Sequence, residues 1–295
     1  MRLLLLGGSG QVGTEFQGLP LPRGVEVVAP DKGSLDLTDH GALDSVVADG
    51  SWSAVINAAA YTDVDRAESE EAKALAVNGE APARLAAATS RLGIPLVHIS
   101  TDYVFDGRKG APYVESDAPS PLNAYGRTKL AGEQAVAAGN PRHLIVRTSW
   151  VYSPFRRNFV RTILRLASER DRLTIVADQR GCPTAAQDVA SACLSVALRC
   201  ASNPESGPYG LYHFAGGGEA TWHEFAKAIV ELARLPRSIE VVPIGTEDYP
   251  TPAKRPLDSR LDCGALDRDF QIKPRPWHKA LKDTLDRLLA TKATS

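Results

Sequence analysis

Tyr125 and Lys129 lie four residues apart in the segment SPLNAYGRTKLAGE, residues 120–133. If a helix begins near Pro121, side chains at this spacing rise from one helical face as neighbours. A free tyrosine has a pKa of about 10, and a nearby ammonium stabilises the phenolate and lowers that pKa. The pair predicts an acid tuned by a cation, although the same spacing also arises from simple helix packing.

A hydroxyl group further upstream completes a set suited to reducing a carbonyl. The predicted strand PLVHIS, residues 95–100, brings Ser100, Thr101 and Asp102 to its carboxyl end. Open α/β sheets bind ligands at that edge. Thr101 can polarise a substrate carbonyl there, and Tyr125 can protonate the developing alkoxide. Hydride would come from a nicotinamide, and Lys129 would also hold the cofactor ribose.

A glycine-rich loop, GGSGQVG, follows the first predicted strand and contains Gly7, Gly10 and Gly13. Between a strand and a helix, glycines allow a tight turn and a close approach to a pyrophosphate at the helix N-terminus. Asp31 follows Gly13 by 18 residues, close to the offset expected of a carboxylate on the adenosine ribose. Asp31 favours NADH because it repels a 2′-phosphate, whereas Lys32 could receive that phosphate. The choice between NADH and NADPH stays open.

Three alanines, Ala58 to Ala60, follow the predicted strand AVIN, residues 54–57. Small side chains at the carboxyl edge of a sheet leave room for a bound dinucleotide. Ordinary packing of a helix on the sheet would select the same residues, so the alanines support a cofactor site without defining it.

A parallel sheet is needed to bring these segments together. Apolar runs alternate with helical stretches, which predicts parallel strands with right-handed crossovers. The runs are RLLLL at 2–6, VEVV at 25–28, AVIN at 54–57, PLVHIS at 95–100 and HLIVRT at 143–148. We expect an α/β fold with a Rossmann-type doubly wound parallel sheet over residues 1–150, completed by about 184–213. The less regular stretches 151–183 and 214–295 form a smaller substrate-binding region.

Two helical segments carry more specific predictions. Residues 65–91 are rich in Ala, Glu and Arg, which indicates one helix or two joined at Pro82. In TWHE, residues 221–224, Thr221 and Glu224 match the capping box that begins a helix.

Composition excludes several classes of protein. The 34 basic and 35 acidic side chains nearly balance, which argues against nucleic acid as a partner. The N-terminal apolar run Leu3–Leu6 is far shorter than the roughly 20 residues of a spanning helix, so we expect a cytoplasmic protein without a membrane anchor. The four cysteines show no C-x-x-C pairing, and we expect them reduced, mostly buried and free of metal.

These motifs together resemble the extended short-chain dehydrogenase/reductase superfamily and, within it, the dTDP-4-dehydrorhamnose reductase family. The matching segments are GGSGQVG, NAAAYTDVDRAE, STDYVFDG, SPLNAYGRTKLAGE, RTSWVY, GCPT, GLYHFAGGG and RPLDSRL. The glycine loop and Y-x-x-x-K are shared across the superfamily. By contrast, STDYVFDG followed by SPLNAYG and RTSWVY is specific to this family.

The resemblance implies NAD(P)H-dependent reduction of the C4 carbonyl of dTDP-4-dehydrorhamnose to dTDP-L-rhamnose, with Thr101, Tyr125 and Lys129 as the catalytic set. The implied dinucleotide contacts are Gly10, Gln11, Val12, Asp31, Asp36, Leu37, Ala58, Ala59 and Ala60. The implied contacts to the nucleotide-sugar are Thr101, Asp102 and Trp150. Because guanidinium groups suit a diphosphate, our candidates for that group are Arg255 and Arg260, with Asn158.

The resemblance also raises the question of Mg²⁺, which bridges carboxylates of two subunits in some family members. This chain keeps Glu15 but has Gln187 where a glutamate would stand, and a neutral amide is a poor ligand for Mg²⁺. A monomer or a homodimer with a metal-free contact is equally compatible with the sequence.

Two other functions stay open. One is a nucleotide-sugar epimerase or dehydratase with the same fold. The other is a non-catalytic NAD(P)-binding regulatory subunit, such as that of methionine adenosyltransferase, although an intact set of Thr101, Tyr125 and Lys129 argues against it.

Overall fold

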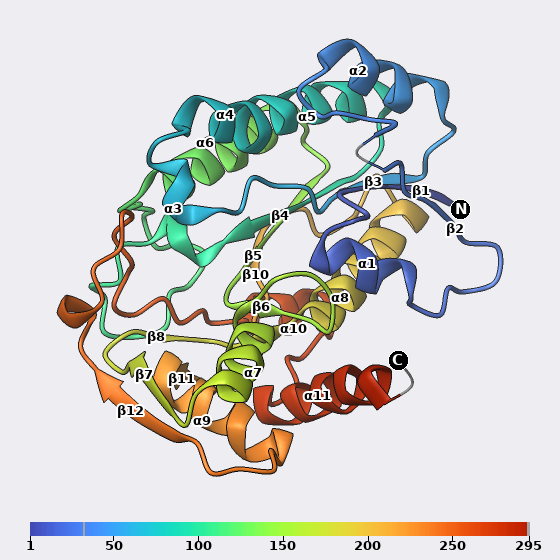
Figure 1. Cartoon of the computed structure of the whole chain (residues 1–295). Coiled ribbons are helices and arrows are strands. Elements are labelled where there is room, and N and C mark those ends of the chain that lie inside the picture. The colour runs from blue at the N-terminus through green and yellow to red at the C-terminus, as the bar shows by residue number, and fades with distance from the viewer. Residues whose placement is uncertain (32, 294–295) are drawn as a thin grey trace.

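A computed structural model describes residues 1–31 and 33–293, and its centre is a sheet of six strands with parallel neighbours throughout. In sheet order the strands are β10 (Gly210–His213), β5 (His143–Thr148), β4 (Leu96–Thr101), β3 (Ala54–Asn57), β1 (Arg2–Leu6) and β2 (Glu26–Val28) (Figure 1). Every apolar run singled out in the sequence forms one of these strands. The predicted doubly wound parallel sheet is confirmed.

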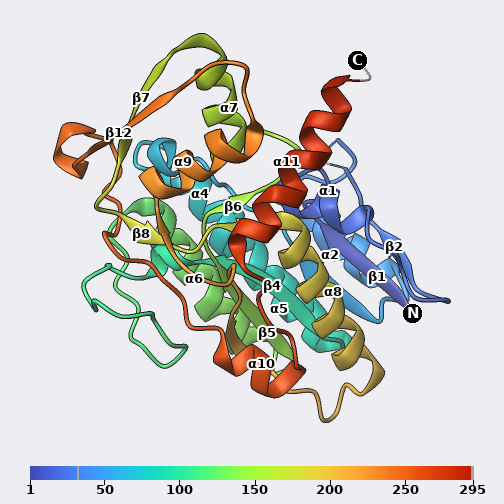
Figure 2. The same ribbon diagram turned by 90° about the horizontal axis from the view of Figure 1, so that it is seen from below.

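Helices cover both faces of this sheet (Figures 1 and 2). One face carries α2 (His40–Asp49), α5 (Ala81–Leu92) and α6 (Ala124–Gly139), and the other carries α1 (Gln11–Gln17) and α8 (Ala186–Ser202). Side chains of a strand point alternately to the two faces. Leu3 and Leu5 therefore enter one core, while Leu4 and Leu6 enter the other. Burial on both faces explains why the strands are continuous apolar runs.

The segment after β3 differs from the predicted helix over residues 65–91. It contains α3 (Val64–Ala67), α4 (Glu71–Leu75), a π-helical turn (Ala76–Glu80) and α5. A join at Pro82 is wrong, because Pro82 lies in the first turn of α5, where a missing N–H is tolerated. In the π-helical turn Asn78 is buried; its Oδ1 accepts from Tyr61 N at 2.8 Å, and its Nδ2 donates to Thr128 Oγ1 at 3.1 Å.

Helix α6 begins at Ala124 rather than near Pro121. Asn123 caps it, since the Asn123 carboxamide oxygen accepts from Gly126 N at 2.8 Å. Gly126 allows α6 to lie close to the short 3-10 helix η2 (Asp102–Val104), because a Cβ at this position would be 2.2 Å from Tyr103 O. The cap and this approach fix Tyr125 beside the end of β4.

A second region packs on the carboxyl edge of the sheet (Figures 1 and 2). Its strand pairs are β6 (Val151–Tyr152) with β9 (Thr184–Ala185), β7 (Arg172–Val176) with β12 (Glu240–Ile244), and β8 (Arg180–Gly181) with β11 (Ala220–Thr221). Its helices are α7 (Phe159–Glu169), α9 (Trp222–Ala233), the short 3-10 helix η3 (Thr246–Asp248) and α11 (Trp277–Ala293), while α10 (Gly264–Phe270) packs beside β10. Thr221 and Glu224 form the predicted capping box of α9.

The expectation that the cysteines are mostly buried is confirmed. All four, each within the described residues, are free thiols; Cys182, Cys193 and Cys200 are buried and Cys263 is partly exposed. No helix within residues 1–31 and 33–293 is both long and apolar enough to cross a membrane.

Candidate active site

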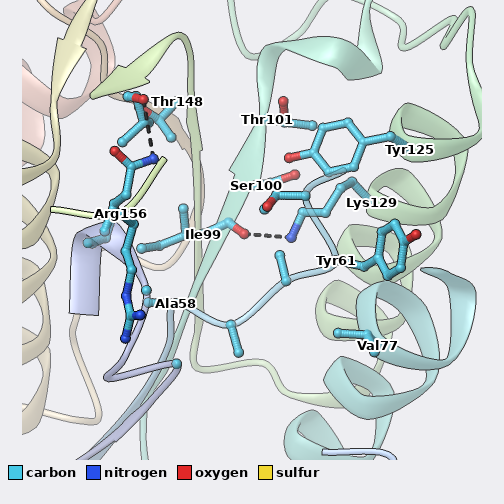
Figure 3. A pocket seen from close by; sticks show the side chains of 18 of the residues that line it. Ala58, Tyr61, Val77, Ile99, Ser100, Thr101, Tyr125, Lys129, Thr148 and Arg156 are labelled. Atoms are coloured by element: carbon cyan, nitrogen blue, oxygen red, sulfur yellow. Dashed lines mark hydrogen bonds between the residues drawn. The ribbon is translucent and has the colours of Figure 1, made fainter. Parts of the chain in front are cut away.

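A cavity of about 770 Å³ lies between the carboxyl edge of the sheet and the second region (Figure 3). One side of the cavity is formed by the ends of β4 and β5, which lie level because Thr101 pairs with Thr148. The sequence-predicted residues that line the cavity are Gly7, Gly10, Gln11, Val12, Asp36, Leu37, Ala58, Ala59, Ala60, Thr101, Asp102, Tyr125, Lys129, Trp150 and Asn158.

The glycine loop forms one end of this cavity and fits a dinucleotide. Gly7 has a φ of 80°, which favours glycine, and a Cβ on Gly13 would lie 2.1 Å from Gly7 O. Gly13 therefore supports the turn without lining the cavity. Gly10 is the N-cap of α1, and among the described residues no side chain accepts a capping hydrogen bond there. The first backbone amides of the helix are therefore left to bind a phosphate. The buried hydroxyls of Ser100 and Thr148 line the same cavity, and within the described chain neither has a hydrogen-bond partner.

Thr101, Asp102 and Tyr125 meet at the wall formed by η2 and α6. Thr101 Oγ1 donates to Asp102 Oδ1 at 3.1 Å and accepts from Tyr103 N at 3.2 Å. Burial raises the pKa of Tyr125 to about 12, although a hydrogen bond with Thr101 opposes the shift. Burial also raises the pKa of Asp102, which is 2% exposed, to about 7. Tyr125 consequently holds its proton at neutral pH and can act as an acid.

The predicted net lowering of the Tyr125 pKa is wrong for this arrangement, because that pKa is raised. Lys129 Nζ is turned onto the sheet, where it donates to Ile99 O at 2.7 Å and lies 3.4 Å from His98 Nε2 (Figure 3). Burial outweighs any stabilisation of the phenolate, so the pKa of Tyr125 rises. Burial also lowers the pKa of Lys129 to about 8, against the opposing charge of Glu133.

Asp31, predicted on the adenosine ribose, is exposed and lies outside the lining of the cavity. Its Oδ1 accepts from Ser34 N at 2.8 Å, and hydrogen bonds from Ser34 lower the pKa of Asp31. Lys32, the other candidate for reading the 2′-position, lies outside the described residues. Asp36 and Leu37 line the cavity at this end.

Trp150 forms a wall on the side of the second region. It has a φ of 47°, and its ring stacks on that of Trp222 with centroids 3.5 Å apart. Gly181 makes room for the indole, because a Cβ there would lie 2.4 Å from Trp150 Cε2. Asn158 also lines the cavity, but its side chain caps α7, with Oδ1 accepting from Arg161 N at 3.2 Å.

The two arginines proposed for the diphosphate are bound to carboxylates of this chain instead. Arg255 forms a bidentate pair with Asp65 at 2.7 and 2.9 Å. Arg260 contacts Asp258 and Glu219, each at 2.6 Å for the shortest contact. Neither guanidinium lines the cavity described here. For Arg255 sequence reasoning could not anticipate this, because its carboxylate partner Asp65 lies 190 residues away, whereas Asp258 is only two residues from Arg260.

Arg156 is a cavity residue that the sequence analysis missed. Its Nε donates to Ser9 O of the glycine loop at 2.7 Å, and its side chain lies across the cavity from Tyr125 (Figure 3). Arg156 has a φ of 57°, an unusual conformation that tends to occur at functional sites. The only sequence signal is the pair of arginines in SPFRRN, which does not reveal the fold back onto Ser9.

The position that would hold Mg²⁺ does not suit a divalent cation. Glu15 is 4% exposed and pairs with Arg287 through two contacts of 2.9 and 3.0 Å. Arg287 Nη1 also lies 3.4 Å from Gln187 Oε1. A guanidinium of the same chain thus occupies the carboxylate, and the described residues contain no cluster of three or more candidate metal ligands.

Comparison with known proteins adds independent information. Residues 1–290 match the family model described as the RmlD substrate binding domain. The chain is 43% identical over 291 residues to a dTDP-4-dehydrorhamnose reductase of Sinorhizobium fredii, with 98% of each chain covered.

This chain is also similar to solved structures of dTDP-4-dehydrorhamnose reductases. A dTDP-4-dehydrorhamnose reductase of Clostridium acetobutylicum has a TM-score of 0.91 at 38% identity and covers 98% of this chain and 100% of its own. The corresponding Bacillus anthracis protein, in complex with NADP, has a TM-score of 0.89 at 34% identity, with 97% and 99% covered.

Proposed function

The chain belongs to the dTDP-4-dehydrorhamnose reductase family, and on this premise we propose that it reduces the C4 carbonyl of dTDP-4-dehydrorhamnose to give dTDP-L-rhamnose. The observation that carries the proposal is the hydrogen-bonded pair Thr101 and Tyr125 in a cavity that also contains the glycine loop. Such a pair presents two hydroxyls to one substrate oxygen.

The reaction needs a hydride donor and a proton donor. Bound NADPH or NADH supplies the hydride. Thr101 orients the substrate carbonyl by a hydrogen bond, and Tyr125 gives its proton to the oxygen as negative charge develops there. Since the pKa of Tyr125 is raised to about 12, the phenol is protonated before each turnover. Lys129 holds the cofactor ribose and stabilises the phenolate left behind.

For the cofactor we propose contacts from Gly7 to Gly13, Asp36, Leu37 and Ala58 to Ala60. Arg156 is our candidate for the cofactor phosphates, because it reaches the cavity from its anchor on Ser9. Arg255 and Arg260, the candidates for the diphosphate of the nucleotide-sugar, both pair with carboxylates and are not proposed for that role.

The nucleotide-sugar occupies the side of the second region. We propose that residues 151–183 and 214–295 bind it, with Trp150 and Asp102 as contacts. Trp150 supports this role because it lines the cavity while stacked on Trp222. The free cysteines support a cytoplasmic enzyme, which would act as a monomer or a homodimer.

The direct test is a spectrophotometric assay with purified protein, dTDP-4-dehydrorhamnose and NADPH or NADH. We expect stoichiometric loss of the nicotinamide absorbance and a fall in kcat of about 10²–10⁴ for Tyr125→Phe. Product formation without net consumption of cofactor would indicate an epimerase or dehydratase. Absence of turnover with both cofactors, despite tight binding, would indicate a regulatory subunit.

A further inference from the structure

Behind the candidate site a buried chain of polar side chains ends at Lys129. Asn57, at the end of β3, and His98, on β4, are both 0% exposed, and Lys129 on α6 is 1% exposed. Asn57 Nδ2 lies 3.1 Å from His98 Nδ1, and His98 Nε2 lies 3.4 Å from Lys129 Nζ. The mechanism above assigns no role to Asn57 or His98, although together they connect β3 to Lys129.

The backbone fixes the orientation of the Asn57 carboxamide. Ala59 N donates to Asn57 Oδ1 at 3.1 Å. If the carboxamide were turned over, its NH₂ group would face this backbone N–H, and two donors would oppose each other. Asn57 therefore presents its NH₂ group to His98, so His98 Nδ1 must be the acceptor.

This contact determines where His98 carries its proton. Burial, with the charge of Lys129, lowers the pKa of His98 well below its usual value, so the imidazole is neutral. A neutral imidazole has one N–H and one acceptor nitrogen. Since Nδ1 accepts from Asn57, the proton lies on Nε2, the nitrogen that faces Lys129.

An N–H directed at Lys129 Nζ favours the amine over the ammonium. An ammonium has three donors and no acceptor, whereas a neutral amine can accept from His98 Nε2–H. The amine still has protons to donate to Ile99 O, which lies 2.7 Å from Nζ. The polar contacts behind Lys129 thus act in the same direction as its burial, which lowers its pKa to about 8.

Other charged groups near Lys129 do not reverse this preference. Glu133, one turn along α6, favours the ammonium, but its carboxylate forms a bidentate pair with Arg147 of β5 at 2.6 and 2.9 Å. On the cavity side lie Tyr125, whose pKa is raised, and Asp102 of η2, which titrates near pH 7.

We propose that Asn57 and His98 are positioning residues for Lys129. Asn57 fixes the tautomer of His98, and the Nε2–H of His98 favours the neutral amine of Lys129 over its ammonium. The consequence for turnover rests on the proposed reductase function. There, Lys129 must be an ammonium to stabilise the Tyr125 phenolate, so this contact sets the upper pH limit of the reaction. The loop Ala58 to Ala60 is connected to these polar side chains by the hydrogen bond from Ala59 N to Asn57 Oδ1.

The first test measures the tautomer in the wild-type chain and needs no activity. Long-range ¹H–¹⁵N correlation spectra of the histidine-labelled protein distinguish Nε2–H from Nδ1–H, and His98→Gln assigns the signals. We expect a neutral His98 with its proton on Nε2 from pH 6 to pH 8. A proton on Nδ1, or a charged imidazolium at pH 7, would overturn the proposal even if the protein is an active reductase.

The second test reverses the tautomer with Asn57→Asp. A carboxylate still accepts from Ala59 N but also accepts from His98 Nδ1–H, which leaves the Nε2 lone pair facing Lys129. The ammonium is then favoured, and we expect the alkaline limb of the kcat/KM profile to move up by about one pH unit or more, with the proton of His98 now on Nδ1.

Asn78→Asp is the matched control, because Asn78 is also buried but bonds to Tyr61 and Thr128 instead of His98. It adds a carboxylate and should leave the tautomer unchanged, with a smaller shift of the limb. Equal shifts in the two variants would show that added charge, and not the tautomer, is responsible. If the wild-type tautomer is as expected but no reduction occurs, the proposed function fails while the contact itself stands.

Discussion

The buried ion pair between Arg147 and Glu133 allows a quantitative test of the packing around the candidate site. Arg147 on β5 is 2% exposed and Glu133 on α6 is 4% exposed. The guanidinium makes two contacts of 2.6 and 2.9 Å with the carboxylate and lies 4.9 Å from the ring centroid of Phe105. Arg147→Met keeps the apolar volume but leaves the Glu133 carboxylate buried without its cation.

The expected cost is large because a buried charge is left uncompensated. Removing one partner of such a pair costs about 3–5 kcal/mol, whereas replacing both by apolar residues costs little or nothing. With an m-value of roughly 3 kcal/mol/M in urea, the unfolding midpoint of Arg147→Met should fall by about 1–1.7 M. The double variant Arg147→Met with Glu133→Leu should recover most of that loss.

Urea unfolding followed by tryptophan fluorescence and far-ultraviolet circular dichroism measures both effects. The matched control is Arg127→Met, because Arg127 pairs with Glu71 in a bidentate contact of 2.9 and 3.0 Å while both side chains are 46% exposed. An exposed pair contributes about 0–1 kcal/mol. The reasoning is refuted if Arg147→Met is no more destabilised than Arg127→Met, or if the double variant is as unstable as Arg147→Met alone.

Three further predictions concern the cavity. Arg156→Gln should weaken NADPH binding by about tenfold in a fluorescence titration, since a charged hydrogen bond is lost. The control is Arg234→Gln, because Arg234 is an exposed arginine also at positive φ (48°), and it should leave NADPH affinity unchanged. Equal losses of NADPH affinity in the two variants would contradict the assignment of Arg156 to the cofactor phosphates. Gly181→Ala should displace Trp150, whose indole would be 2.4 Å from the new Cβ, and raise KM for the nucleotide-sugar without changing NADPH affinity; an unchanged KM would remove Trp150 from the sugar site. Burial raises the pKa of Asp102 from 3.8 to about 7, so between these pH values the folded state keeps a proton on Asp102 that the unfolded state has lost. This group therefore makes the free energy of unfolding decrease as the pH rises from about 4 to about 7. Asp102→Asn should abolish that decrease in thermal unfolding, whereas parallel curves for the wild type and the variant would show that Asp102 ionises normally.

Local signals in the sequence predicted much of the fold and part of the cavity lining. The five leucine-rich or β-branched runs became strands because parallel strands buried on both faces must be apolar. The glycines at 7 and 13 could be interpreted directly, since the tight strand-to-helix turn leaves no room for a side chain at either position. Short-range spacing also found Thr221 with Glu224, and it placed Tyr125 on a helix, with an error of three residues in the start.

Longer-range features were set by the tertiary structure. Arg255 pairs with Asp65 and Arg260 with Glu219, two carboxylates that folding brings near them. Arg156 reaches Ser9 across 147 residues of sequence. A sequence gives the charge of an arginine, but the nearest carboxylate or backbone oxygen depends on how distant elements pack.

The same distinction applies to Tyr125 and Lys129. Their spacing of four residues determined that they share a helix, and their types determined which protons they can exchange. Their pKa shifts, up for the phenol and down for the lysine, come from burial between α6 and the sheet. The direction in which Lys129 points is decided by Ile99 O and His98 on a neighbouring strand, because burial and hydrogen-bond partners are properties of the folded chain.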